Sequence, residues 1–238
     1  MGKRFETRLD AEVPATPQQV WEAIATGPGV SSWFVGHTDI DGDTVRTTFG
    51  EQQILAGQVT GRDEPHRFAY RGDTADDGRF IAYEYLVEGR DGAATVLRSV
   101  TAGFLPGDDW AAEYEAMQYG TALFFATLLE CLRHFPGRSA TPVTAFGPPV
   151  ADWPAAWARL HATLGLGDDP RPGDPVRAEL GAVVGEVYFV NPHTLGIRTP
   201  NALLRFIRGL HGAMVAGHEL FTPVPDAASA WTAFLHRS

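Results

Sequence analysis

Apolar and polar residues alternate over the first part of the chain. Residues 4–13 carry side chains such as Phe5 and Leu9 at every second position, with charged residues between them. This period of two is typical of a strand with one buried face. A helix is then expected from Pro17, because Thr16 is a favourable N-cap and proline fits the first helical position.

A short second helix and a run of strands are expected next. The Gly-Pro-Gly sequence at 27–29 interrupts the first helix, and the second helix is predicted to run through residues 33–34. Turns rich in glycine and aspartate then separate five predicted strands, at 44–49, 53–61, 66–71, 79–88 and 94–103. Strands joined by such short turns must be antiparallel. The fourth strand places Tyr83 and Tyr85 on the same face.

The longest helical pattern covers residues 110–135. Apolar side chains recur there at three- and four-residue steps, namely Trp110, Tyr114, Met117, Thr121, Phe124 or Phe125, Leu128, Leu132 and Phe135. Pro136-Gly137 ends the pattern. A helix with so broad an apolar face needs a large partner, and the antiparallel sheet is the nearest candidate.

A stretch rich in proline, glycine, threonine and alanine divides the chain. Residues 137–150 are therefore predicted as a linker, which leaves residues 151–238 as a second part. The elements predicted there are a helix at 151–164, strands at 176–180, 183–190 and 194–199, a helix at 200–209, a strand at 213–222 and a helix at 226–237. The segment Pro154–Trp157 echoes Pro17–Trp21, which raises two readings: a shortened internal repeat, or coincidence.

Four segments of the first part share an order and spacing with a known family. They are Pro14-Ala-Thr-Pro-Gln-Gln-Val20-Trp21 running to Trp33-Phe34, Gly57-Gln-Val59 followed by Glu64-Pro65-His-Arg67-Phe68-Ala-Tyr70, Thr95-Val-Leu-Arg-Ser-Val-Thr-Ala-Gly103-Phe104, and Tyr119-Gly120 before Leu123 to Leu132. Together they resemble the START-like (SRPBCC) superfamily, and within it the homologues of the activator of the heat-shock-protein-90 ATPase. The chain departs from the family pattern at Tyr119-Gly120, where members often carry Gly-Trp.

The resemblance implies an α+β helix-grip fold, in which a curved antiparallel sheet wraps around a long C-terminal helix. It places this domain at residues 1–136, before the linker at 137–150. Residues 151–238 look like a C-terminal α+β extension seen in some bacterial members. The eukaryotic co-chaperone that gives the family its name also needs a client-binding domain, which is not recognisable here, so the family name is weak grounds for a chaperone role.

Composition narrows the possible partners and the compartment. The net charge of −10, without a basic stripe, disfavours nucleic acid and anionic membranes. No window approaches about 18 consecutive apolar residues, so no membrane span is expected. The N-terminal residues lack the apolar run of a secretory signal, and Cys131 is the single cysteine, which excludes an internal disulfide. We therefore expect a cytoplasmic protein.

The resemblance also implies a hydrophobic cavity between the long helix and the sheet, where relatives bind lipids, sterols or polyketides. Large aromatic and flexible side chains on both surfaces would line it, namely Trp33, Phe68, Tyr70, Tyr83, Tyr85, Tyr114, Met117, Thr121 and Phe125. The alternative for each of them is ordinary core packing. Buried tyrosine hydroxyls need hydrogen-bond partners, so a cluster of them indicates either water or the polar end of a ligand.

No residue pattern points clearly to catalysis or to a metal. The Gly-x-Ser-x-Gly motif is absent, and the eight histidines show no metal-binding spacing. Cys131 is expected to be an inert buried thiol. Glu113 would suit a general acid only if it faced the cavity, and it lies at the edge of the apolar stripe. No catalytic residue, metal ligand or cofactor is therefore predicted.

Three hypotheses about function remain. The first is binding of a small apolar or amphipathic molecule in the cavity. The second is an enzyme of the cyclase, dehydratase or aromatase type that uses the same cavity and needs an inward ionisable residue. The third is an interaction or co-chaperone-like module, in which exposed apolar area on the second part docks a partner. A homodimer is left open as an assembly.

Overall fold

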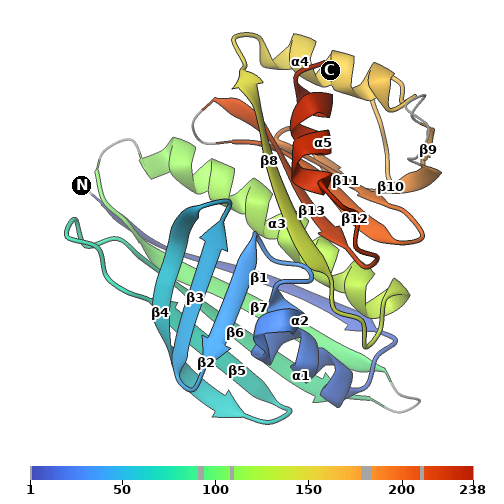
Figure 1. Ribbon diagram of the computed structural model, residues 1–238. Helices are drawn as coiled ribbons and strands as arrows, with labels where there is room; N and C mark the ends of the chain where they lie inside the picture. Colours follow the sequence, from blue (N-terminus) through green and yellow to red (C-terminus); the bar gives the residue numbers. More distant parts are fainter. Residues whose placement is uncertain (1, 91–93, 108–109, 178–183, 210–211, 238) are drawn as a thin grey trace. The chain divides into compact units, whose positions relative to one another are not determined.

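Figure 1 shows the computed structural model of the chain. It describes residues 2–90, 94–107, 110–177, 184–209 and 212–237. The chain divides into two compact units, Met1–Ser139 and Ala140–Ser238, called unit 1 and unit 2 below. Each unit holds one antiparallel sheet. No helix in the described ranges is long and apolar enough to cross a bilayer.

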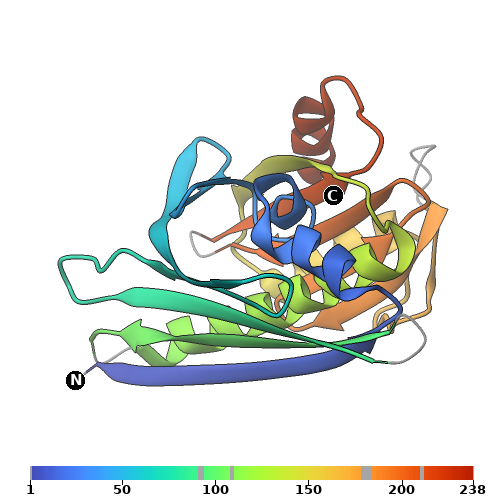
Figure 2. The ribbon, with the colours of Figure 1, turned by 90° about the horizontal axis from the view of Figure 1, so that it is seen from below.

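The first and the last strand of unit 1 in sequence lie side by side in its sheet. Its elements in chain order are β1 (Lys3–Val13), α1 (Pro17–Ala25), α2 (Gly27–Val30), β2 (His37–Asp41), β3 (Thr44–Phe49), β4 (Gln52–Asp63), β5 (Arg67–Gly72), β6 (Phe80–Gly89), β7 (Thr95–Leu105) and α3 (Trp110–His134). The strand order is β1-β7-β6-β5-β4-β3-β2. The sheet bends, and α1, α2 and α3 lie on its inner side (Figure 2).

Local sequence explains the start of α1. The Thr16 hydroxyl accepts a hydrogen bond from the Gln19 amide, and the Gln19 side chain accepts one from the Thr16 amide. This reciprocal capping box satisfies two amides that a helix leaves unpaired. Pro17 occupies the first turn as predicted. The buried stripe of the helix is Val20, Trp21, Ile24 and Ala25.

Two predictions for unit 1 need correction. The short helix does not run through residues 33–34: α2 spans only Gly27–Val30 and starts within the Gly-Pro-Gly sequence. The Thr26 hydroxyl accepts a hydrogen bond from the Gly29 amide, so this cap starts a new helical turn where glycine and proline had indicated a break. Strand β2 was not predicted; its polar residues pair with β3, for example Thr38 with Thr47.

Unit 2 repeats the same order of elements in shorter form. Its elements are β8 (Thr141–Pro149), α4 (Trp153–Thr163), β9 (Pro175–Arg177), β10 (Val184–Asn191), β11 (Thr194–Arg198), β12 (Ala202–Arg208), β13 (Ala213–Leu220) and α5 (Ala227–Leu235). The strand order is β8-β13-β12-β11-β10-β9, so the first strand again lies beside the last. Residues 178–180 of the strand predicted at 176–180 lie outside the described residues.

Two predictions for unit 2 are wrong. The linker expected at 137–150 contains β8, which pairs with β13 and so belongs to the sheet. The helix expected at 200–209 is strand β12, in which Ala202 to Phe206 are all buried. A strand buried on both faces reads as a continuous apolar run, which periodicity cannot distinguish from a buried helix.

Candidate functional site

The inner face of the unit 1 sheet gathers tyrosines from two adjacent strands. Phe68 of β5 lies opposite Tyr85 of β6, and Tyr70 lies opposite Tyr83. Side chains directly opposite each other on antiparallel strands share a face of the sheet. The register therefore brings these four predicted residues together, and all except Tyr83, which is half-buried, are almost fully buried.

The helices complete an aromatic cluster on this face. The ring centroids of Trp33 and Tyr85 lie 6.0 Å apart, and the Tyr70 and Tyr83 rings stack at 4.9 Å. Phe34 joins the cluster to α3 through Phe124, at 5.2 Å. The close ring contacts show that this end of the inner face is well packed.

Hydroxyl groups gather within the cluster. Tyr85 lies opposite Ser99 of β7 and diagonal to Tyr70 of β5, so the three hydroxyl-bearing side chains share one region of the inner face. Burial raises the pKa of Tyr70, Tyr83 and Tyr85 well above the usual tyrosine range. These hydroxyls therefore stay protonated at neutral pH and can each donate one hydrogen bond.

The helix α3 has two different halves. From Leu123 onward it buries Leu123, Thr127, Leu128, Cys131 and Leu132. The predicted residues Tyr114, Met117, Thr121 and Phe125, which lie on or next to the first half, are only half-buried. The first half therefore leaves partly accessible aromatic and flexible side chains beside the inner face of the sheet.

Polar and aromatic contacts hold the first half of α3 to the sheet. The Gln118 amide donates to the Thr7 hydroxyl of β1, and the Tyr114 ring lies 5.6 Å from that of Phe5. Glu113 accepts a hydrogen bond from Arg79. Because Glu113 is bound to a guanidinium, it does not present the protonated carboxyl that a general acid needs.

The nine predicted site residues fall into two groups. Trp33, Phe68, Tyr70, Tyr83 and Tyr85 meet in one cluster, whereas Tyr114 contacts Phe5 and Trp110 elsewhere on the face. Phe124 supplies the ring contact to Phe34, although the prediction named Phe125. Ser99 was missed, and the alternation along β7, which places it opposite Tyr85, was a usable signal.

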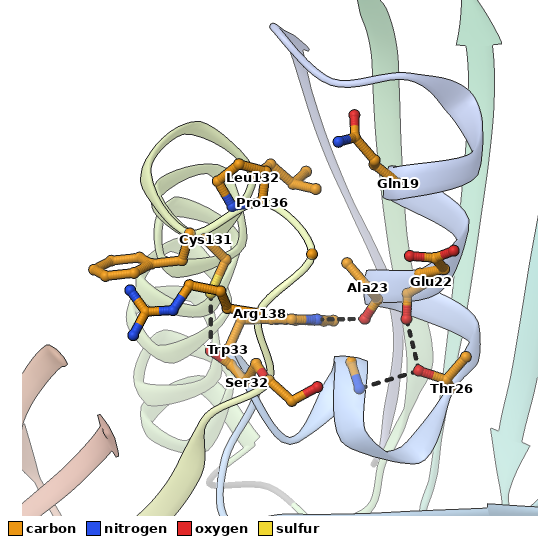
Figure 3. A pocket seen from close by; sticks show the side chains of 14 residues that line it. Gln19, Glu22, Ala23, Thr26, Ser32, Trp33, Cys131, Leu132, Pro136 and Arg138 are labelled. Atoms are coloured by element: carbon orange, nitrogen blue, oxygen red, sulfur yellow. Dashed lines mark hydrogen bonds between the residues drawn. The ribbon is translucent and has the colours of Figure 1, made fainter. Parts of the chain in front are cut away.

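A cavity of about 200 Å³ has Trp33 in its wall. Its walls come from α1, α2 and the C-terminal end of α3 (Figure 3). The Trp33 indole N–H donates to the Ala23 carbonyl at 2.8 Å, which fixes the ring as part of the wall. Cys131 is buried in the same wall, and its thiol donates to the Ser32 carbonyl at 2.9 Å.

Unit 2 buries a charged cluster on β12 and β13. The Arg205 guanidinium pairs with Glu219 and donates to the Gly217 carbonyl at 2.7 Å. The Nδ1 atom of His218 accepts a hydrogen bond from the Arg205 amide, and its ring lies perpendicular to that of Trp231, with the centroids 4.1 Å apart. Burial lowers the pKa of His218 to about 3 and raises that of Glu219, against the pull of Arg205.

A second cavity, of about 290 Å³, lies in unit 2 between β8, α4 and the end of α5. Asp152 and Arg159 line it together with apolar residues. Across the described parts of both units, no three histidine, cysteine, aspartate or glutamate side chains are grouped to hold a metal ion.

Comparison with known proteins gives a family and several similar folds. No curated protein matches the chain. The chain is similar to the crystal structure of the di-domain ARO/CYC BexL from the BE-7585A biosynthetic pathway, with 16% identity over 96% of this chain and 88% of that chain, at a TM-score of 0.49. It is also similar to DynU16, from the dynemicin biosynthetic locus, with 18% identity over 97% and 96% of the two chains, at a TM-score of 0.45. The Aha1 dimer from Colwellia psychrerythraea is 17% identical over 54% of this chain and 96% of that chain, at a TM-score of 0.43.

The family assignment rests on sequence. The pattern of the family described as "Polyketide cyclase / dehydrase and lipid transport" matches residues 4–132, which is more than half of the chain and falls within unit 1. The START-like resemblance read from the four segments is thereby confirmed. The chain belongs to the polyketide cyclase / dehydrase and lipid transport family of the START-like (SRPBCC) superfamily.

Proposed function

We propose that unit 1 binds a small hydrophobic or amphipathic molecule between the first half of α3 and the inner face of its sheet. The ligand is lipid-like or polyketide-like, with an apolar body and at least one oxygen. Membership of a family described by polyketide cyclisation and lipid transport supports this class of ligand. The apolar body lies against Tyr114, Met117, Thr121 and Phe125, which are half-buried.

The cluster of buried tyrosines is the observation that carries this proposal. An ordinary core would favour phenylalanine at Tyr70 and Tyr85, since burying a hydroxyl carries a desolvation cost. Both tyrosines are instead buried on the inner face, with Ser99 opposite Tyr85. Tyr83 stacks on Tyr70 and is only half-buried, so its hydroxyl is the one best placed to meet the oxygen of a ligand.

Native mass spectrometry of the full chain purified from its own host tests this proposal. We expect a co-purifying small molecule, and a rise in melting temperature with dodecanoate or with the tricyclic phenol emodin as probes. Tyr83→Phe should weaken binding of the probe by about five-fold, since a hydrogen bond inside an apolar site is worth about 1 kcal/mol. Tyr188→Phe, in unit 2, is the matched control and should leave binding unchanged.

Two results would contradict the proposal. The first is the bare chain mass together with no thermal shift across fatty acids, sterols and aromatic polyketides. The second is binding that Tyr83→Phe and Met117→Ala leave intact, because the ligand would then lie elsewhere.

A cyclase or dehydratase activity at the same place is the second candidate. One observation favours it: three neutral tyrosines lie in one cluster, and their hydroxyls can donate hydrogen bonds to a developing oxyanion. The described residues of the inner face show no carboxylate or histidine to act as a base, which is why binding alone is preferred. The enzyme would be favoured if the unaltered chain turns over a poly-β-ketone analogue and if Tyr83→Phe still binds this analogue but no longer turns it over.

The interaction module has the weakest support. Within the described ranges, the large exposed apolar side chains are Ile54, Phe146, Val184 and Val224, and they lie on separate segments. Singly exposed apolar residues are normal on protein surfaces. Light scattering on the purified chain tests the predicted homodimer.

A further inference from the structure

We propose that the cavity between α1, α2 and the C-terminal end of α3 is a second binding site, for a small organic amine with an apolar body. This site is separate from the inner face of the sheet, where the ligand of the proposed function binds. At about 200 Å³ the cavity is smaller than a typical drug-sized pocket, so it takes a ligand the size of an arylalkylamine.

The apolar part of the cavity comes from three elements. Leu132 and Pro136 lie on the α3 side, and Ala23 faces them from α1 (Figure 3). Trp33 closes the floor with its indole, and an aromatic surface favours both apolar groups and cations. Such a lining holds the hydrocarbon body of a ligand through its apolar surface.

The walls are held in place before a ligand binds. The Trp33 N–H is bonded to the Ala23 carbonyl, and the Cys131 thiol is bonded to the Ser32 carbonyl. The Thr26 hydroxyl donates to the Glu22 carbonyl at 2.7 Å and accepts from the Gly29 amide. A preformed site spends less of its binding free energy on ordering side chains.

The rim selects for positive charge on its α1 side. Gln19 and Glu22 both line the cavity, and they lie three residues apart, on the same face of α1. The Glu22 side chain is exposed, so its carboxylate is hydrated until a cation approaches. An ammonium group beside this carboxylate and the Gln19 amide oxygen matches the charge and hydrogen-bonding capacity of the rim.

The end of α3 adds to the negative potential. The last carbonyls of a helix carry a partial negative charge, and α3 is 25 residues long. The basic residues of its last turn, Arg133 and His134, pair with Glu130 at 3.8 and 3.5 Å. Arg138 lines the cavity with its side chain, but its guanidinium lies over the Phe135 ring, 5.5 Å from the centroid. Glu22 and the C-terminal end of α3 therefore both repel an anion and both attract a cation.

Calorimetric titration of the full chain with 2-phenylethylamine, and with 3-phenylpropanoate as the anion of matched shape, tests the proposal. We expect the amine to bind and the carboxylate not to bind. Glu22→Gln should weaken binding of the amine by about five-fold, as expected for the loss of an accessible ion pair. Glu51→Gln removes an exposed carboxylate on the β3–β4 turn and should leave binding unchanged.

Two further measurements place the ligand. Cys131 is the single cysteine of the chain, so methyl methanethiosulfonate labels this wall alone, and bound amine should slow the labelling. Ala23→Leu should fill the cavity and abolish amine binding, while dodecanoate binding at the inner face stays the same. The proposal is overturned if the amine gives no heat at millimolar concentration, if the carboxylate binds equally well, or if Ala23→Leu binds the amine like the unaltered chain.

Discussion

The two units run through the same order of elements and differ in what they place inside. Each begins with a strand that pairs with the last strand of its own sheet, follows it with a helix, and ends on a helix (Figure 1). The first helix of each unit carries a tryptophan at its fifth position, Trp21 in α1 and Trp157 in α4. Trp21 and Trp157 thus occupy equivalent positions, whereas Pro17 is the first and Pro154 the second residue of its helix, and the shortened repeat stays a prediction beside coincidence.

The final helices and the interiors differ. The helix α3 has 25 residues and α5 has nine. Unit 1 places tyrosine, serine and threonine hydroxyls on the inner face of its sheet, whereas the core of unit 2 is built from side chains such as Leu195, Leu204 and Phe206. The same topology therefore encloses different polar groups: unit 1 buries hydroxyls on the inner face of its sheet, whereas unit 2 combines its apolar core with the buried pair of Arg205 and Glu219.

The largest test of this comparison removes the buried charge of unit 2. Arg205→Met should lower the free energy of unfolding by about 3–5 kcal/mol, because Glu219 stays buried without its partner. Urea unfolding measures the loss, and amide exchange should show it first in unit 2. Arg198→Met, at the more exposed pair with Glu186, should change stability by about 1 kcal/mol or less. Equal losses in the two variants would contradict the argument.

The second test varies pH. The pKa of His218 is about 3 in the folded chain against 6.5 for an unperturbed histidine, because of burial and the neighbouring Arg205. As the pH falls from 6.5 toward 3, His218 becomes protonated in the unfolded chain but stays neutral in the folded chain. The His218 contribution to the free energy of unfolding should therefore fall by about 1.4 kcal/mol per pH unit. The pKa of Glu219 is raised in the folded chain, so above pH 4.5 its contribution to the free energy of unfolding increases as the pH falls, opposite to that of His218. Urea unfolding of the unaltered chain and of His218→Leu gives the free energy of unfolding at each pH, and the difference between the two isolates the histidine. If the two pH profiles are identical, the pH dependence does not come from His218.

The third test addresses the buried tyrosine hydroxyls of unit 1. Tyr85→Phe should lower the free energy of unfolding by about 1 kcal/mol, because the buried polar side chains Tyr70 and Ser99 lose a polar neighbour. Thermal unfolding followed by circular dichroism measures the change. A variant as stable as the unaltered chain would mean that the Tyr85 hydroxyl has no structural role, and its role would then have to lie in ligand binding alone.

The smallest test compares the first helices of the two units. The Thr16 hydroxyl accepts from the Gln19 amide at 3.2 Å, and the Asp152 carboxylate accepts from the Ala155 amide at 3.0 Å. Thr16→Ala and Asp152→Ala should each cost about 1 kcal/mol of stability. Urea unfolding of both variants checks this, and a difference above about 1 kcal/mol between them would show that the two helices are not equivalent in energy.

Several elements could be predicted because their signals are local. The alternation of β1, the cap of α1 and the three- and four-residue period of α3 each depend on residues close together in sequence, and all three elements appear as expected. Strands β8 and β12 were missed for a non-local reason. β8 is rich in proline and threonine and is held in the sheet by β13, while β12 is buried on both faces from Ala202 to Phe206.

The candidate site was predictable in part for the same reason. The tyrosines of β6 could be placed on one face by alternation, but their meeting with Tyr70 depends on the register between β5 and β6. The cavity beside Trp33 had no sequence signal, since Glu22 and Leu132 are more than a hundred residues apart.

The sequence by itself determined the family, the helices with clear caps and periods, and the apolar faces that each element had to bury, because these follow from propensity and spacing along the chain. Only the tertiary structure decided which tyrosines gather on the inner face, where the cavities lie, and that unit 2 buries an arginine with a glutamate. Those outcomes depend on strand register and on contacts between distant segments, and burial then sets the charge of each group through desolvation.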